Sequence, residues 1–446
     1  MRPALTLTYV VTSNFNSKPY LSIAKLSLYS IFNAIEEINM QRNYKILLID
    51  SASTDGSFEE LLELGKKLSI ETKISFEAIR LDKDLGNSFA YFYGFLYSRS
   101  RGADYVIYMD NDLVVTYPET LLKMQELAEK LSRANIKYYA VAPMIIWDNR
   151  ERGARIAGKN IDPRIIIQYI RKDVETSMGK KILETNTVYI DILGRVINPL
   201  NGPLLECRDI ISPSHEKTKK PFIISPFAAS TFSLHPSRVA PLFPFLYIWG
   251  DDLLTAGYHA YKGYYSYIIP ESISVHYIIS PKKRTSPKEL YYSNRNNVFI
   301  NFASGRNKHL FYVVASLYKL LLWTPQSLIG LRRYVLHFLK EKYYIIGGYA
   351  PFNATKYAVT GFIHGLLSYN KVSKLLDEWF KKYLDEPPQY DLQEYFIYKG
   401  SEAGIARLLL YIFTGRKELL FRRGRRYCLK RLFRGEDQMV TVSRLN

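Results

Sequence analysis

Cysteine is scarce in this chain, because its 446 residues include only Cys207 and Cys428. Two thiols cannot form a disulfide framework or a multi-cysteine zinc site, so disulfide-rich secreted proteins are excluded and a reducing compartment is expected. Long hydrophobic runs are also missing: the longest stretch without a charged residue, 221–237, is broken by three prolines. A membrane-spanning helix needs about 20 apolar residues, so we do not expect a polytopic membrane protein. Residues 1–11 are too rich in threonine for a signal-peptide core, and we expect no secretory leader.

Negative charge is in deficit, and the deficit is concentrated near the carboxyl end. The chain has 61 Lys and Arg against 42 Asp and Glu, and residues 301–446 hold 24 of the former and 11 of the latter. This surplus suggests an anionic partner, either nucleic acid or an anionic membrane surface. Residues 416–434 combine nine basic residues and one acid with leucine and phenylalanine, as in a basic amphipathic helix on anionic lipid. An ordinary helical bundle with a solvated basic face would explain the pattern equally well.

Strand and helix signals alternate through the first 150 residues. Apolar runs predict strands at 5–12, 44–50, 74–81, 105–109 and 138–144, and helical spacing predicts helices at 19–40, 58–68, 88–100 and 118–134. Such alternation indicates right-handed βαβ units and a mostly parallel sheet. From 150 to 218 the pattern loosens into short strands, turns and charged loops. Strands are again expected near 264–269 and 274–277, and long amphipathic helices after 303.

Polar clusters follow three of the predicted strands. They are Thr12-Ser13-Asn14, the segment from Asp50 to Ser57, and Asp110-Asn111-Asp112. Ligands of open α/β sheets bind at the carboxyl ends of strands. Two carboxylates one residue apart can hold a magnesium-type cation, which would also take diphosphate oxygens. An isolated Asp-x-Asp is usually a turn or a helix cap, but the preceding strand and the companion acid Asp50 favour a cation site.

These motifs resemble the family 2 glycosyltransferases of the GT-A fold over about the first 300 residues. Residues 10–16 look like their first strand and nucleotide loop, and 48–57 are similar to their second-strand motif, whose strand-end Asp contacts the nucleoside base. Residues 84–87, with Gly94 further along, resemble a degenerate form of their Asn-x-Gly helix start, and Asp110-Asn111-Asp112 matches their metal-binding motif. The resemblance implies donor contacts from Thr12, Ser13, Asn14, Asp50, Asp55, Gly86, Asn87, Asp110, Asn111 and Arg295.

Later residues supply the other roles that the resemblance implies. Asp252 would be the catalytic base and Asp251 its neighbour in the acceptor site, both at an expected helix start whose dipole favours an anion. Leu254 stands where the family has a further acid. His276 would complete the shell of a cation, Mg²⁺ or Mn²⁺, held by Asp110 and Asp112. The spacing between Asp252 and His276 resembles that in the branch of galactofuranosyl- and rhamnosyltransferases. The Tyr-x-x-Arg-Asn element at 292–296 is also similar to an element of that branch. Arg295 could pair with the diphosphate or form a structural contact.

Two motifs are absent from the sequence, and their absence disfavours an ATPase and a processive polysaccharide synthase. There is no Gly-x-x-x-x-Gly-Lys-Ser/Thr phosphate loop and no Gln-x-x-Arg-Trp element of processive polysaccharide synthases. We expect a GT-A catalytic domain over 1–302, with a nucleotide-binding half at 1–145 and an acceptor half at 146–302. A mainly helical, basic and membrane-associating domain would follow over 303–446.

The expected enzyme is inverting and metal-dependent and is placed on the cytoplasmic face of a membrane. Its expected donor is a UDP- or dTDP-linked sugar, and its acceptor is a glycan or lipid-linked hydroxyl. The alternatives are a nucleic-acid-binding protein that uses the basic region and an inactive GT-A scaffold. The intact set of Asp110, Asp112, Asp252 and His276 argues against the scaffold.

Overall fold

A computed structural model describes most of the first 300 residues and one later helix. The described residues are 6–177, 231–248, 250–261, 264–278, 287–303 and 355–383, with short strands at 183–184, 189–190, 196–197, 223–225, 426–428, 433–434, 438–439 and 443–445.

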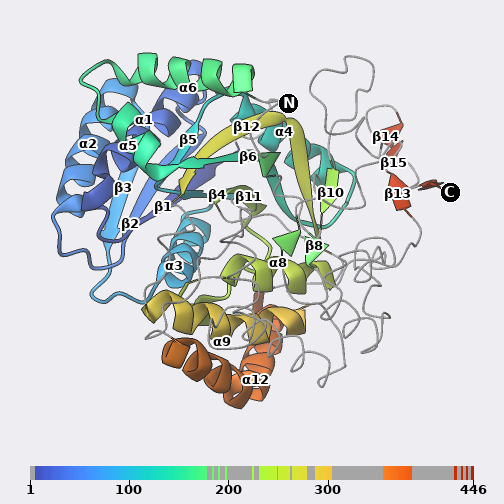
Figure 1. Ribbon diagram of the computed structural model, residues 1–446. Coiled ribbons are helices and arrows are strands. Elements are labelled where there is room, and N and C mark those ends of the chain that lie inside the picture. The colour runs from blue at the N-terminus through green and yellow to red at the C-terminus, as the bar shows by residue number, and fades with distance from the viewer. Residues whose placement is uncertain are drawn as a thin grey trace.

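A mixed sheet forms the centre of the molecule (Figure 1). Its strands are β1 (Thr8–Asn14), β2 (Tyr44–Asp50), β3 (Ser75–Arg80), β4 (Tyr105–Asp110), β5 (Leu113–Val115), β6 (Tyr138–Asn149), β7 (Leu183–Glu184), β10 (Ile223–Ser225), β11 (Phe232–Pro236) and β12 (Tyr265–Ile278). The strand order is β10-β12-β6-β11-β4-β1-β2-β3, with β5 paired to β12 and β7 to β6. Strands β3, β2, β1 and β4 are mutually parallel, whereas β11 runs antiparallel to β4 and β6.

Helices cover both faces of this sheet. They are α1 (Leu21–Glu37), α2 (Ser57–Thr72), α3 (Asn87–Ser100), α4 (Glu119–Arg133), α5 (Arg150–Ala157), α6 (Pro163–Ser177), α8 (Asp251–Tyr261), α9 (Pro287–Ala303) and α12 (Thr355–Tyr383), with short 3-10 turns η1 (Lys18–Tyr20) and η4 (Pro244–Leu246). The remaining short strands are β8 (Tyr189–Ile190), β9 (Val196–Ile197), β13 (Arg426–Cys428), β14 (Phe433–Arg434), β15 (Gln438–Met439) and β16 (Ser443–Leu445).

The alternation of side chains along the strands builds two buried clusters. Tyr9 and Val11 of β1 join the cluster under α3, while Val10 points to the opposite face, under α1. Residues two apart in a strand share a face, so one apolar strand serves both cores. Gly94 allows α3 to approach closely, because a Cβ there would lie 2.4 Å from Cγ1 of Val11.

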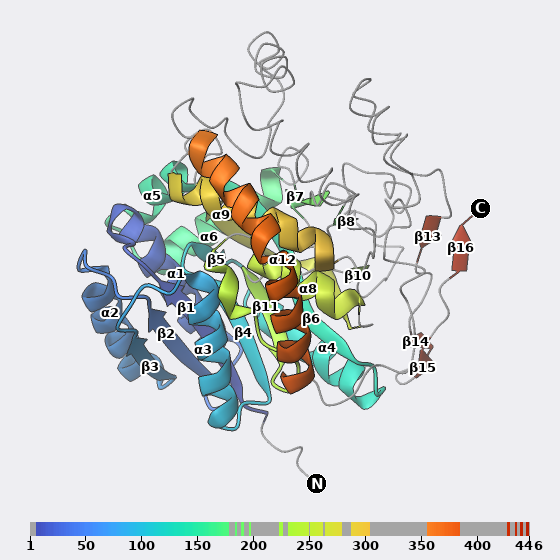
Figure 2. The same ribbon diagram turned by 90° about the horizontal axis from the view of Figure 1, so that it is seen from below.

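Two helices that are far apart in the sequence pack against each other beside α8. Figure 2, seen from below, shows α12 crossing α9. A Cβ on Gly361 would lie 2.2 Å from the carbonyl oxygen of Tyr291, and one on Gly365 would lie 2.8 Å from that of Arg295. Glycine is therefore required where the two backbones meet. Trp379 and Phe380 of α12 continue the main core.

The alternation predicted for the first 150 residues is confirmed, including a strand at Tyr44–Asp50. The expectation of short strands and loops after 150 was wrong for 150–177, which form α5 and α6. The two strands expected near 264–277 are one strand, β12, with a register shift between Ile269 and Ile273. Of the helix expected over 416–434, residues 426–428 and 433–434 are strands, and the rest lie outside the described residues.

Candidate active site

The parallel strands bring three polar clusters to one edge of the sheet. Asn14 pairs in register with Asp50, and Ser13 pairs with Asp110, so β1, β2 and β4 end side by side. Most of the polar residues predicted from the sequence are therefore neighbours in space. This edge is where an open α/β sheet binds its ligand.

Asn14 lies at the centre of a buried hydrogen-bond network. Its Nδ2 donates to Oδ1 of Asp50 at 2.8 Å and faces the hydroxyls of Ser53 and Ser57, each at 3.1 Å. Its Oδ1 accepts from the Ser17 hydroxyl at 2.6 Å and from Nδ2 of Asn111 at 3.2 Å. The side chain thus joins the ends of all three strands. Buried polar groups that are fully hydrogen-bonded hold a site rigid.

Asp50 is fully buried, with its carboxylate enclosed by partners of its own. Oδ1 accepts from the Ser53 hydroxyl at 2.6 Å, and Oδ2 accepts from the Ser53 backbone N–H at 2.9 Å. Nε of Arg80 lies 3.5 Å from Oδ2. Asp55 accepts from the backbone N–H of Lys18 at 2.8 Å and fixes the turn into α2. The contact of Asp50 with a nucleoside base stays a prediction.

The start of α3 closes the same edge from the side. The hydroxyl of Ser13 donates to Oδ1 of Asn87, the first residue of the helix, and Thr12 is buried nearby in β1. Gly86 caps this helix with φ of 87°, a conformation in which residues other than glycine are strained. Tyr91, one turn into α3, donates from its hydroxyl to Oδ1 of Asp110 at 2.7 Å.

Asp110, Asp112 and His276 form one group that could hold a metal ion, with their ligand atoms all within 4.8 Å of one another. Nε2 of His276 lies 2.9 Å from Oδ1 of Asp112 and 3.7 Å from Oδ2 of Asp110. The pairing of β5 with β12 explains this arrangement, because His276 pairs with Leu113 and the Tyr277 N–H donates to the Asp112 carbonyl at 2.9 Å. Two carboxylates and an imidazole suit a Mg²⁺- or Mn²⁺-type ion.

Arg150 completes this group, and sequence reasoning missed it. The guanidinium of Arg150 donates to Oδ2 of Asp112 and, from Nε, to the Tyr277 carbonyl at 3.2 Å. The guanidinium carbon of Arg150 lies 4.2 Å from the ring centroid of Tyr20. The two oxygens of Asp112 therefore have separate partners, Oδ1 on the side of His276 and Oδ2 on the side of Arg150. Arg150 belongs to no recognised motif, and it lies here because β6 and β12 are neighbours.

The two acids of the metal group have different electrostatic surroundings. Burial raises the pKa of Asp110, and the charge of Asp112 adds to this effect while His276 opposes it. For Asp112, burial is outweighed by His276 and Arg150, so its pKa is lowered. Asp112 is therefore held as the ionised carboxylate that a cation needs.

The acidic pair lies at the first turn of α8, as the sequence predicts. Asp251 is buried and Asp252 is half-buried. Burial raises the pKa of Asp251, and the negative charge of Asp110 adds a smaller contribution.

Arg295 lies on α9, where its contacts are with the loop that leads to α8. One guanidinium nitrogen donates to the Leu246 carbonyl at 2.7 Å, and Nε donates to Oδ1 of Asn296 at 2.9 Å. The described contacts thus hold the loop before α8 in place. They fit the second interpretation from the sequence, in which Arg295 forms a structural contact. A contact of Arg295 with a diphosphate stays a prediction.

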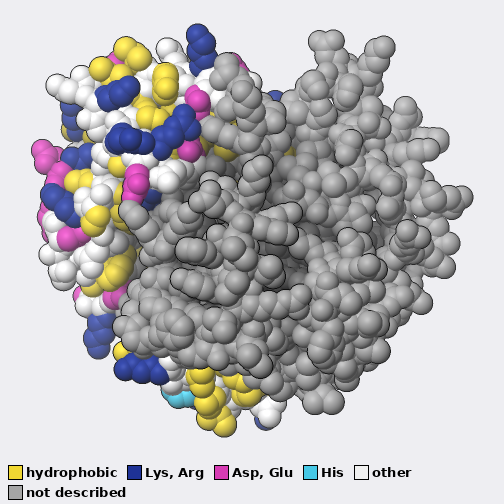
Figure 3. Space-filling view, in the orientation of Figure 1, with side chains coloured by type: hydrophobic (Ala, Val, Ile, Leu, Met, Phe, Trp, Pro, Cys, Tyr) yellow, Lys and Arg dark blue, Asp and Glu magenta, His cyan; other side chains and the backbone are white. Residues whose placement is uncertain are grey.

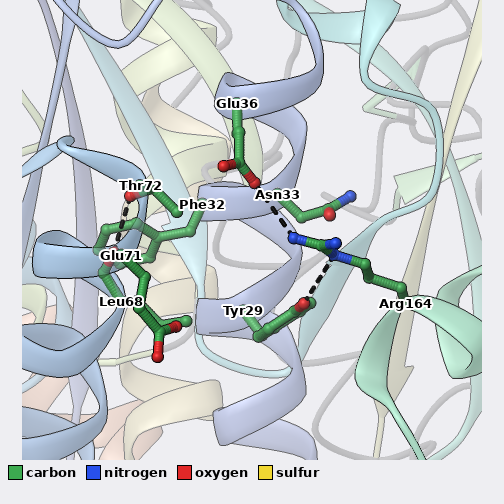
Figure 4. Close-up of a pocket in the computed structure, with 8 residues that line it drawn as sticks. All are labelled: Tyr29, Phe32, Asn33, Glu36, Leu68, Glu71, Thr72 and Arg164. Atoms are coloured by element: carbon green, nitrogen blue, oxygen red, sulfur yellow. Dashed lines mark hydrogen bonds and ion pairs between the residues drawn. The ribbon is translucent and has the colours of Figure 1, made fainter.

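A separate cavity of about 250 Å³ lies between α1, α2 and α6, away from the predicted residues (Figure 4). Arg164 of α6 crosses it, with Nε donating to the Tyr29 hydroxyl at 3.1 Å and a terminal nitrogen 3.4 Å from the Glu36 carboxylate. These contacts join α6 to α1. The cavity contains none of the residues of the candidate site.

Comparisons with known proteins found one family match and a set of similar solved structures. Residues 9–178 match the family described as glycosyl transferase family 2. No curated protein sequence matches the chain. Among solved structures, GalNAc-T7 with UDP, GalNAc and Mn²⁺ is similar at 16% identity and a TM-score of 0.43, over 66% of this chain and 48% of that one. The chain thus spans about half the length of that structure.

A mannosyltransferase from Pyrobaculum calidifontis, in complex with GDP-Man and Mn²⁺, is similar at 13% identity and a TM-score of 0.39. The match covers 81% of this chain and 86% of that one. The family match itself covers the strand ends at Asn14, Asp50 and Asp110, the edge that the geometry marks as the ligand site. Residues 9–178 are therefore similar in sequence to family 2 glycosyltransferases, and the mixed sheet with helices on both faces has the GT-A architecture that this similarity implies.

Proposed function

We propose that the protein is an inverting, metal-dependent glycosyltransferase that moves a sugar from a nucleotide-diphosphate donor to a hydroxyl of a glycan or lipid-linked acceptor. One observation carries this proposal: Asp110, Asp112 and His276 are gathered at the ligand-binding edge of the sheet, and the acidic pair Asp251-Asp252 begins α8. The first group suits a cation that binds diphosphate, and the second offers a carboxylate for an acceptor hydroxyl.

Asp110, Asp112 and His276 would hold the cation, whose charge would stabilise the departing diphosphate. Arg150 would keep Asp112 oriented by binding the oxygen that faces away from His276. Asn14 would hold the strand ends in register, and the start of α3 would enclose the donor from one side.

Asp252 would accept the proton of the acceptor hydroxyl as the hydroxyl oxygen attacks the anomeric carbon. The new bond forms between that oxygen and the carbon, while the bond from the carbon to the diphosphate oxygen breaks. The nucleoside diphosphate leaves with the bonding electrons, and Asp252 later releases the proton to solvent. A single displacement of this kind inverts the anomeric configuration. A positioned base typically contributes about 10²–10⁴-fold to the rate.

The donor that we propose is UDP- or dTDP-linked, as in the galactofuranosyl- and rhamnosyltransferase branch. The position of His276 after the acidic pair and the Tyr-x-x-Arg-Asn element at 292–296 support this narrower assignment. A screen of nucleotide sugars, scored by hydrolysis with Mg²⁺ or Mn²⁺ present, would identify the sugar and the nucleoside.

Asp252→Asn tests the base. This variant keeps the shape of the side chain but removes its proton acceptor, so transfer should fall by about 10²–10⁴-fold while the nucleoside diphosphate still binds. Glu126→Gln, on the exposed side of α4, is the control for loss of a remote carboxylate. If the donor affinity of Asp252→Asn falls as much as its turnover, Asp252 is a donor-site residue and the base lies elsewhere.

Asp112→Asn tests the metal site. Loss of a charged ligand should abolish transfer and weaken the binding of Mn²⁺ without unfolding the protein. Paramagnetic resonance of Mn²⁺ measures the binding. Full activity of this variant, or undiminished activity in excess chelator, would contradict a metal-dependent mechanism.

We further propose that residues 1–302 form the catalytic domain and that the region 303–446 attaches it to the cytoplasmic face of an anionic membrane. Among the described residues, no helix is long and apolar enough to span a bilayer. However, α12 exposes Val359, Ile363 and Leu367 at intervals of four residues, and Leu367 is 79% exposed. Figure 3 shows hydrophobic side chains gathered at the lower edge, where Figure 1 has α12. Exposed Lys356 and Lys371 lie on the same helix, as an interfacial helix requires.

Vesicle flotation tests this attachment. Replacing both Ile363 and Leu367 by Glu should release much of the protein from anionic vesicles, because burial and charge are both needed for firm binding. Ile70→Glu, a similar change at an 81% exposed residue of α2, should leave binding intact. If the unmodified protein ignores vesicles and binds oligonucleotides with steep salt dependence, the basic region contacts nucleic acid instead.

A further inference from the structure

Tyr247 has a strained backbone immediately before the acidic pair. It follows the η4 turn with φ of 72° and ψ of −64°, a combination that residues with a side chain rarely adopt. Asp251 and Asp252 begin α8 only four and five residues later. Strain of this kind persists only where surrounding contacts impose it.

One set of these contacts comes from the donor side of the site. The Tyr247 carbonyl accepts from the Ser88 N–H at 3.3 Å, and its hydroxyl donates to Oδ2 of Asp84. A Cβ at Gly86 would lie 2.2 Å from the Tyr247 carbonyl oxygen. The segment 84–88, which opens α3 and contacts Ser13 through Asn87, is therefore packed directly on the backbone of Tyr247.

The other set comes from α9. The ring of Tyr247 stacks on that of Tyr292, with centroids 4.6 Å apart and planes 16° apart. On either side of Tyr247, the backbone is held by Asn296, whose Nδ2 donates to the Leu246 carbonyl at 3.2 Å and to the Ile248 carbonyl at 2.8 Å. Arg295 adds its bond to Leu246 and lies over Tyr292, with its guanidinium carbon 4.6 Å from the ring centroid.

We propose that Tyr247 is a positioning residue that couples occupancy of the donor site to the placement of the acidic pair. The coupling rests on the proposed function, because it assigns the donor to the edge near 84–88 and the base to Asp252. A donor that orders 84–88 would act on Tyr247 through its carbonyl and hydroxyl, and the first turn of α8 follows four residues later. The Tyr-x-x-Arg-Asn element would then serve as the anchor against which Tyr247 is held.

The test needs no acceptor and no knowledge of the sugar. UDP, dTDP, GDP and ADP are each titrated calorimetrically with Mn²⁺, and amide hydrogen exchange of 246–256 is measured with and without the nucleotide that binds. In the unmodified protein, the nucleotide should slow exchange in this segment by about tenfold. Tyr247→Phe removes the hydroxyl and its bond to Asp84 but keeps the carbonyl, so it should bind the nucleotide within about twofold yet lose part of this protection.

Two further variants distinguish a loss of this coupling from a general loss of structure. Asn296→Ala, which removes the amide hydrogen bonds to the Leu246 and Ile248 carbonyls, should also lose the protection without losing nucleotide affinity. Tyr29→Phe, which removes a phenolic hydroxyl at the remote cavity, should keep both. Two outcomes would overturn the coupling but not the proposed function. One is unchanged protection in Tyr247→Phe, and the other is a lack of protection in the unmodified protein when a nucleotide binds. Absence of binding by every nucleotide would overturn the proposed function with it.

Discussion

Mild acid should destabilise this protein through two buried histidines. His235 of β11 and His259 of α8 are 1% and 0% exposed. His235 contacts the Ser233 hydroxyl at 2.7 Å and the Tyr139 carbonyl at 3.1 Å, and Nδ1 of His259 donates to the Thr255 carbonyl at 2.8 Å. Nε2 of His259 has no hydrogen-bond partner among the described residues, so a proton there would place an unpaired charge in the core.

The magnitude follows from the pKa values. Burial lowers the pKa of both His235 and His259 to about 3, whereas an unfolded histidine titrates near 6.5. The folded state thus keeps both rings neutral, and their contribution to stability is fully present above pH 6.5. It is lost as the pH falls from 6.5 toward 3, because only the unfolded state gains protons. At pH 5 the loss is about 2 kcal/mol for each ring, a large share of a typical unfolding free energy of about 5–15 kcal/mol.

Urea unfolding at pH 8 and pH 5, followed by circular dichroism, measures this loss. His259→Phe keeps an aromatic ring against Tyr139, whose centroid lies 4.1 Å away, and removes the titration. The difference in unfolding free energy between the two pH values should therefore shrink by about 2 kcal/mol in this variant. His364→Gln, at an exposed position of α12, is the control for removal of a histidine. An undiminished difference in His259→Phe would refute the reasoning.

Three other substitutions test the geometry of the site. Gly86→Ala should lower thermal stability and nucleotide binding, because its Cβ would meet the Tyr247 carbonyl. Gly102→Ala, with a similar positive φ but open space around its Cβ, should cost only about 1 kcal/mol. Equal effects would contradict this reading. Arg150→Met should weaken Mn²⁺ binding by about tenfold, measured by paramagnetic resonance, and tighter binding would show that its charge matters more than its hold on the carboxylate. Asn14→Ala should destabilise the fold by about 2–3 kcal/mol in urea unfolding, since it leaves buried partners unpaired, and a negligible loss would show that those partners find others.

The first half of the fold could be predicted because its strands and helices have clear periods and sharp ends. The segment 44–50, for example, has four consecutive apolar residues and stops at a carboxylate. The helix α6 was missed because its Ile-Ile-Ile run is rich in β-branched residues, which favour strands. Its buried residues Ile166, Ile167, Ile170 and Val174 do follow helical spacing, and this signal could have identified it.

The site was predictable where it depends on short motifs at strand ends, and not where it depends on pairing between distant strands. Asp110 and Asp112 are one residue apart in the sequence, so their proximity needs no fold. The approach of His276 depends on the three-residue strand β5, which is too short to produce a periodic signal, so His276 was expected only from the resemblance to a family and not from the local pattern. Arg150 depends on β6 and β12 being adjacent, which no local pattern encodes.

The charges of the site indicate why a cation and a diphosphate should bind together. Two unit charges about 5 Å apart repel by about 3 kcal/mol at an effective dielectric constant of 20. Asp110 and Asp112 offer ligand oxygens within 4.8 Å of each other, and the charge of Asp110 also reaches Asp251. Arg150 contacts only the far oxygen of Asp112, so a diphosphate arriving alone would meet excess negative charge. A divalent cation removes that excess. Nucleoside diphosphate affinity should therefore depend strongly on the divalent cation.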